Sequence, residues 1–154
     1  MISLFLILFS GVGVTPADSY LERTAQLLEA CRANIPAMTG PAERAAAALA
    51  RGGRLFAAGQ PSLVSEITGR AGGFMMIRPL TNQTLQSGDV VLYTPQAGLP
   101  LPEGLANTEA LVVIFGDPLP GRDTGPAFPS HAEAYGLSPT MAVAAPAWIF
   151  TGEL

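Results

Sequence analysis

The chain of 154 residues contains no lysine, one histidine and one cysteine. Without lysine, catalysis through a lysine Schiff base is excluded. The eight basic residues are therefore all arginines, and they are spread singly along the chain. A nucleic-acid-binding surface needs basic residues gathered into a patch or stripe. Because the formal net charge is also −4, we expect no nucleic-acid partner.

The single cysteine, Cys31, has no second cysteine with which to form an internal disulfide. Cysteine usage therefore says nothing about the compartment of the protein. Cys31 lies on the same stripe of a helical pattern as Leu28 and Ile35. We expect a small buried core residue at this position rather than a nucleophile.

Several catalytic motifs are also missing from the sequence. It has no Cys–His zinc spacing, no Gly-x-Ser-x-Gly elbow and no Walker motif, which excludes zinc, serine-hydrolase and P-loop sites of those types. His131 is the only histidine, so a histidine proton shuttle would have to use it. The acids near it are scattered along a loop, a weak basis for a metal site. We expect no metal and no cofactor, and His131 is either catalytic or a surface residue.

Charged residues make up only 13% of the chain, whereas hydrophobic residues make up 49%. This composition supplies ample material for the core of one domain. We assign that domain to residues 18–154.

Residues 1–14 form an apolar segment that is followed by Thr-Pro-Ala-Asp. A helix across a bilayer needs about 20 apolar residues, so we expect no stable membrane span here. We interpret residues 1–17 as a signal peptide, which would make the protein exported or periplasmic. The alternative is a buried first strand over residues 4–9, which would make it cytoplasmic.

Two helices are predicted before the first clear strand. Ser19 and Glu22 have the spacing of a capping box, and apolar residues then recur at helical intervals, which predicts a helix over residues 19–35. A second helix is predicted from near Pro41, through an alanine-rich stretch, to the glycines at 52–53.

Residues 53–80 combine strand, turn, helix and second strand in one βαβ-like unit. Apolar runs at 54–58 and 74–77 have strand length, a helical pattern covers 63–71, and residues 59–62 read Gly-Gln-Pro-Ser, a turn. In open α/β sheets ligands bind where loops leave the carboxyl ends of strands, and a helix that starts there offers unpaired N–H groups to anions. We therefore expect the functional site at this turn.

This unit resembles the sugar isomerase (SIS) domain, and most closely an uncharacterised bacterial branch of that family. In that branch a strand ending in glycine leads to a serine-containing turn, a helix with a glutamate, and Arg-Ala-Gly-Gly. The matching residues are Gly59, Ser62, Glu66 and 70–73, and the resemblance extends over residues 20–115. It implies a three-layer α/β/α domain of flavodoxin-like architecture with a mostly parallel sheet of four or five strands. It also implies a homodimer and a phosphosugar ligand.

Two positions depart from the family pattern. Phosphosugar-binding SIS proteins carry a Ser-x-Ser-Gly type loop after the second core strand, whereas residues 94–98 here read Thr-Pro-Gln-Ala-Gly. One hydroxyl remains, and Pro95 removes a backbone donor. Gln60 and Pro61 also stand where the branch tends to have His-Ser. The resemblance therefore supports the fold better than it supports catalysis.

The rest of the chain adds two strands and a helix to the prediction. Residues 89–94 and 110–115 are continuous apolar runs, typical of strands buried on both faces of a parallel sheet. Between them, residues 101–107 have room for one or two helical turns. Residues 116–136 read as a long loop, and residues 141–150 as a final helix in which Pro146 would introduce a kink.

Three functions remain open. The first is binding of a phosphorylated sugar or similar small anionic carbohydrate derivative, with little or no catalysis. The second is a sugar-phosphate aldose–ketose isomerase, in which the resemblance makes Glu66 the base, with His131 from a dimer partner. The third is a structural domain without a ligand site; Ser62 would then only cap its helix, and Glu66 would only be solvated. The expected ligand contacts are Gly59, Gln60, Ser62, Thr94, Gln96 and Gly98.

Overall fold

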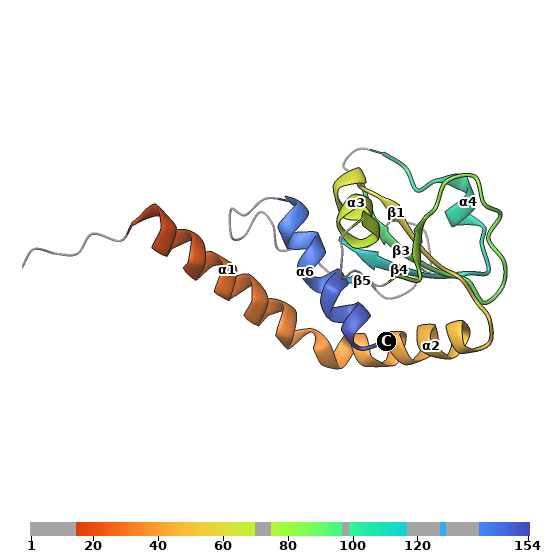
Figure 1. The fold of residues 1–154 in the computed structure, drawn as a ribbon, viewed down its shortest axis with the longest axis horizontal. Coiled ribbons are helices and arrows are strands. Elements are labelled where there is room, and N and C mark those ends of the chain that lie inside the picture. Colours follow the sequence, from red (N-terminus) through yellow and green to blue (C-terminus); the bar gives the residue numbers. More distant parts are fainter. Residues whose placement is uncertain (1–14, 70–74, 97–98, 117–126, 129–138) are drawn as a thin grey trace, which may run out of the picture.

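A computed structural model describes residues 15–69, 75–96, 99–116, 127–128 and 139–154 (Figure 1). The N-terminal segment that we interpret as a signal peptide or a first strand lies almost entirely outside these residues, as do Gly98 and His131. Among the described residues no helix combines the length and the apolar character needed to cross a membrane.

The centre of the domain is a sheet of five strands in the order β2-β1-β3-β4-β5, and every neighbouring pair is parallel. The strands are β1 (Leu55–Gly59), β2 (Ile77–Pro79), β3 (Val90–Thr94), β4 (Leu111–Phe115) and β5 (Ala127–Phe128). This is the strand order of flavodoxin-like folds, so the predicted fold class is confirmed.

One face of the sheet is covered by three helices: α2 (Ile35–Ala50), α3 (Pro61–Gly69) and α6 (Pro139–Gly152). Side chains from alternate strand positions, such as Leu55, Ala57 and Leu92, pack with Leu63 and Ile67 of α3 in this layer. The rings of Phe115, Phe128 and Phe150 lie 5.9 to 6.2 Å apart by centroid. They fasten α6 to the end of β4 and β5.

The opposite face carries Phe56, Val91, Tyr93, Val112 and Ile114 from the remaining strand positions. It is covered by the short helix α4 (Glu103–Ala106), through Leu105, and by the segments on either side of it and before β3. Both faces of β1, β3 and β4 are therefore buried. This explains why these strands read as continuous apolar runs rather than as alternating ones.

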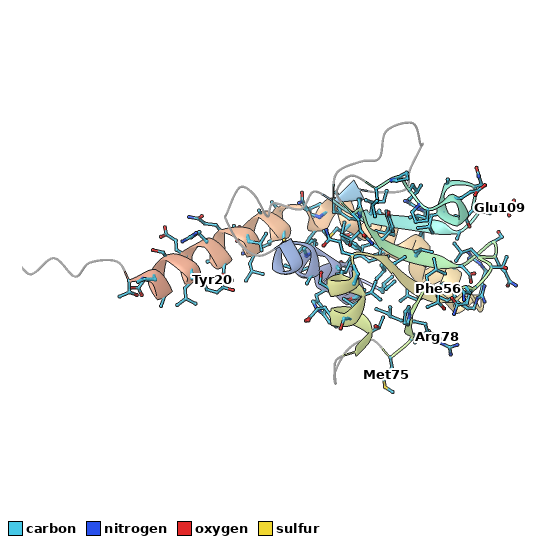
Figure 2. The ribbon with its side chains drawn as sticks, turned by 90° about the horizontal axis from the view of Figure 1, so that it is seen from above. Tyr20, Phe56, Met75, Arg78 and Glu109 are labelled. Atoms are coloured by element: carbon cyan, nitrogen blue, oxygen red, sulfur yellow. The ribbon has the colours of Figure 1, made fainter. Side chains whose placement is uncertain are left out.

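The first helix, α1 (Pro16–Ala33), starts earlier than predicted and uses another capping box. The Thr15 hydroxyl accepts the Asp18 N–H at 3.1 Å, and the Asp18 carboxylate accepts the Thr15 N–H at 3.0 Å. Proline at the first helical position favours this start. Ser19 therefore lies inside the helix, and α1 projects from the rest of the domain (Figures 1 and 2).

The predicted start of the second helix near Pro41 is wrong, because α2 begins at Ile35 and contains Pro41. Proline within a helix removes one hydrogen bond. Here the burial of Met38, Ala42 and Ala45 against the sheet outweighs that loss.

Two strand predictions also need correction. Met75 and Met76 form a turn, and β2 starts at Ile77, because Ile77 pairs with Leu55 and is the residue buried against α3. β2 is an edge strand, where Pro79 is tolerated. Within the segment predicted as one long loop, Ala127 and Phe128 pair with Ile114 and Phe115 as β5.

Candidate functional site at the carboxyl edge

The carboxyl ends of β1 and β3 lie side by side at the point where the chain changes direction across the sheet. β1 leads into α3 on one face, whereas β3 leads towards α4 on the other. In flavodoxin-like folds such a switch point leaves a crevice in which ligands bind. Gly59 and Thr94, which are paired in register, mark this point.

The junction between the two strand ends admits only glycine at position 59. Gly59 has φ +104°, and a Cβ built on it would lie 1.9 Å from the carbonyl oxygen of Thr94. The next residue, Gln60, donates its backbone N–H to that same carbonyl at 3.2 Å. The glycine therefore allows the chain to turn from β1 into α3 while the backbones stay in contact.

The side-chain amides of Gln60 and Gln96 cross-link the two loops. Gln60 Nε2 donates to the Pro95 carbonyl at 3.3 Å, and Gln96 Nε2 donates to the Gly59 carbonyl at 2.9 Å. Both residues were predicted to contact a ligand directly. In the structure their amide nitrogens hold the shape of the site.

The amino terminus of α3 begins at this junction. Val64 N–H donates to the Gln60 carbonyl at 3.1 Å, so the backbone N–H groups of Ser62 and Leu63 precede the first helical hydrogen bond. The Ser62 side chain is exposed in this first turn. The geometry supplies the partial positive charge that attracts anions to helix starts.

Thr94 is the buried polar side chain of the junction, with 2% of its surface exposed. Strand alternation places it on the same face as Val90 and Leu92, which is the face that α3 covers. Its hydroxyl has no hydrogen-bond partner within the described part of the chain. Buried hydroxyls usually have one, so this group is an exception that needs a reason.

A cleft of about 660 Å³ opens beside Gly59, on the α4 side of the sheet edge. Its floor and rim come from the end of β1, from the segment after β2 and from α4. The lining residues are Ala58, Gly59, Leu80, Thr81, Gln83, Thr84, Leu85, Pro102, Gly104, Leu105, Asn107 and Thr108. Of these described lining residues none carries a charge.

The sequence analysis did not predict this cleft: residues 101–107 were expected to form one or two helical turns, and neither this segment nor residues 80–85 were assigned to a site. Their hydroxyl and amide residues, interrupted by single leucines, were the available signal. That signal has no fixed period, and only the folding of both segments over the same face of the sheet turns it into a cleft wall.

An ion pair at the other end of the sheet anchors one cleft wall. Arg54 Nη2 donates to the Thr84 carbonyl at 2.9 Å and to Asp89 Oδ2 at 2.6 Å. Asp89 Oδ2 also accepts the Gln86 N–H at 2.8 Å. Hydrogen bonds from Arg54 lower the pKa of Asp89 in spite of its burial. Asp89 binds Gln86 directly and Thr84 through Arg54, so the ion pair fixes the position of the segment that carries Thr84.

Of the described candidate residues only Gly59 lines the cleft, whereas Gln60, Ser62, Thr94 and Gln96 belong to the junction and do not line it. Glu66 is half-buried in α3 and does not line the cleft. Cys31 is 2% exposed, which confirms the prediction of a core residue, and burial raises the pKa of its thiol. The described residues contain no cluster of three or more histidine, cysteine or acidic side chains that could hold a metal ion.

Comparisons with protein-family models, with curated proteins and with solved structures find no match to this chain. The resemblance to the SIS domain therefore remains an expectation from the residues that carry it.

Proposed function

We propose that this chain is a ligand-binding α/β domain whose ligand is a small anionic carbohydrate derivative, such as a phosphorylated sugar. The observation that carries the proposal is the position of the cleft, which opens beside Gly59, the residue that pairs with Thr94 at the ends of β1 and β3. Its volume of about 660 Å³ falls within the range of small-molecule sites, which is about 300–1,000 Å³.

The anionic group of the ligand is assigned to the start of α3. Two backbone N–H groups, the exposed Ser62 hydroxyl and the helix dipole converge there. The Thr94 hydroxyl, buried on the same side and without a partner among the described residues, offers a further hydrogen bond. Because this hydroxyl is buried, the groups that cover it must move before a ligand can reach it.

Isothermal titration calorimetry with hexose, heptose and amino-sugar phosphates tests the proposal. We expect Ser62→Ala to weaken binding about ten- to a hundredfold, which corresponds to the loss of one charge-assisted hydrogen bond worth about 1.5–3 kcal/mol. Ser65→Ala is the matched control, because Ser65 is exposed on α3 beyond its first turn. If no sugar phosphate binds the unmodified protein, the structural-domain hypothesis replaces this one.

An isomerase would need a base in contact with the sugar, and Glu66 is the candidate for that role. Because Glu66 does not line the cleft, binding is the function that we put forward. Turnover of any sugar phosphate that is abolished by Glu66→Gln, with affinity retained, would replace binding by catalysis.

We also propose a homodimer, formed through the projecting helix α1. Tyr20, Leu21 and Leu28 are 51%, 65% and 50% exposed on it, an unusual set for a surface helix. Light scattering after size exclusion at micromolar concentration should give the mass of a dimer, and Leu21→Glu with Leu28→Glu should give that of a monomer. A monomer mass for the unmodified chain would contradict the proposal.

A further inference from the structure

We infer that the cleft beside Gly59 binds the uncharged, hydroxyl-rich part of the ligand and excludes its anionic group. The inference rests on the proposed function for the location of the site. It goes further by assigning the two chemical ends of the ligand to two sides of the sheet edge.

The polar groups of the cleft are hydroxyls and amides. Thr81 and Gln83 are already joined by a hydrogen bond of 3.1 Å, and the Thr108 hydroxyl accepts the Ala110 N–H at 3.1 Å. The side chains of Thr84 and Asn107 have no hydrogen bond within the described residues, and they come from two different segments of the lining, before β3 and after α4. Each can both donate and accept, as the hydroxyl groups of a sugar do.

The apolar part of the lining suits the C–H faces of a sugar ring. Leu80, Leu85 and Leu105 contribute aliphatic surface between the polar groups. A site with apolar surface and a few placed polar groups is typical of small-molecule pockets. A sugar can contact both the apolar surface and the polar groups of the cleft, whereas a phosphate can form favourable contacts only with the polar groups.

The charges around the cleft oppose an anion inside it. Glu103, the first residue of α4, is exposed, and so is Glu109, which follows the end of this helix (Glu109 is labelled in Figure 2). Arg78 is exposed on β2, two residues before Leu80, and does not line the cleft. Arg54 is occupied by Asp89. Among the described residues that flank the cleft, two exposed glutamates therefore stand against one arginine that is not paired with an acid, and we expect them to repel a phosphate in the cleft.

The test compares each sugar phosphate with its own unphosphorylated sugar, and both with inorganic phosphate, by calorimetry. Gly104→Leu should narrow the cleft, because Gly104 lines it. The substitution should not disturb the fold, because a Cβ on Gly104 meets no atom within 4 Å. Gly152→Leu is the matched control. A Cβ on Gly152 also meets no atom within 4 Å, but Gly152 lies on α6 and does not line the cleft. Asn107→Ala removes a polar wall group without adding volume.

We expect the unphosphorylated sugar to bind, with an affinity that changes less than twofold between low and high salt. Gly104→Leu and Asn107→Ala should each weaken it at least tenfold and leave the binding of inorganic phosphate unchanged, and Gly152→Leu should change neither. If sugar phosphates bind and neither Gly104→Leu nor Asn107→Ala changes their affinity, this inference is wrong and the proposed function still holds. Unphosphorylated sugars that bind while phosphates do not would keep the inference and remove the anionic part of the proposed function. Failure of every probe would reject both.

Discussion

Arg54 and Asp89, at the amino ends of neighbouring strands, form a two-pronged ion pair. Arg54 Nη2 lies 2.6 Å from Asp89 Oδ2, and Arg54 Nε lies 3.1 Å from Asp89 Oδ1. The Asp89 side chain is 3% exposed and the Arg54 side chain 38% exposed. The guanidinium also stacks 5.1 Å above the centre of the Phe56 ring. A geometry of this kind orders the chain segments at both ends of the pair.

Asp89→Asn should lower the free energy of unfolding by about 1.5–3 kcal/mol, since it removes the charge from a buried, hydrogen-bonded acceptor. Chemical denaturation at neutral pH measures this. Glu29→Gln is the control, because the Glu29–Arg32 pair spans 3.7 Å with both side chains more than 70% exposed. Such surface pairs contribute about 0–1 kcal/mol. Equal effects of the two substitutions would contradict the anchoring role of Asp89.

The same pair predicts how stability depends on pH. Hydrogen bonds from Arg54 lower the pKa of Asp89 from its ordinary value of 3.8. A carboxyl with a lower pKa in the folded state contributes stability that is fully present above its unfolded pKa and lost as the pH falls through its folded pKa. The difference in unfolding free energy between the unmodified chain and Asp89→Asn should therefore be constant above about pH 5 and shrink below about pH 4. A difference that grows on acidification would refute this account.

Thr94→Val should raise the stability of the ligand-free protein by about 1 kcal/mol, because it replaces a buried hydroxyl that has no partner among the described residues with a methyl group. Thr151→Val is the matched control and should lower stability, since the buried Thr151 hydroxyl donates to the Trp148 carbonyl at 2.9 Å. Thermal unfolding with and without a sugar phosphate measures both effects. Stabilisation by the sugar phosphate should be smaller in Thr94→Val.

Gly59→Ala should destabilise the protein by at least about 3 kcal/mol, since the new Cβ would meet backbone at a positive φ. The comparison is Gly69→Ala at the end of α3, where a Cβ meets no atom within 4 Å and helix propensity favours alanine. Denaturation midpoints of the two variants should move in opposite directions. An unchanged midpoint for Gly59→Ala would show that the junction with Thr94 is looser than described.

Gly59 and Thr94, two of the residues at which a ligand contact was expected, are paired in register, and α3 with Ser62 starts next to them. The amides of Gln60 and Gln96 were expected at the ligand, but they are bound to backbone carbonyls 35 and 37 positions away in sequence. These bonds could not be predicted from the sequence, because they depend on how the two loops meet in space.

The amino-acid sequence by itself determined the central strands and the turn that follows the first of them. Residues 90–94 and 111–115 are apolar without alternation, and such runs are stable as strands only when both faces are buried. Gly-Gln-Pro-Ser marks a turn between two elements through the local backbone preferences of its glycine and proline. Tertiary structure alone decided the start of α2, the position of β2 and the cleft beside Gly59. Each of these depends on contacts between distant segments, in which burial against the sheet outweighs local signals such as Pro41.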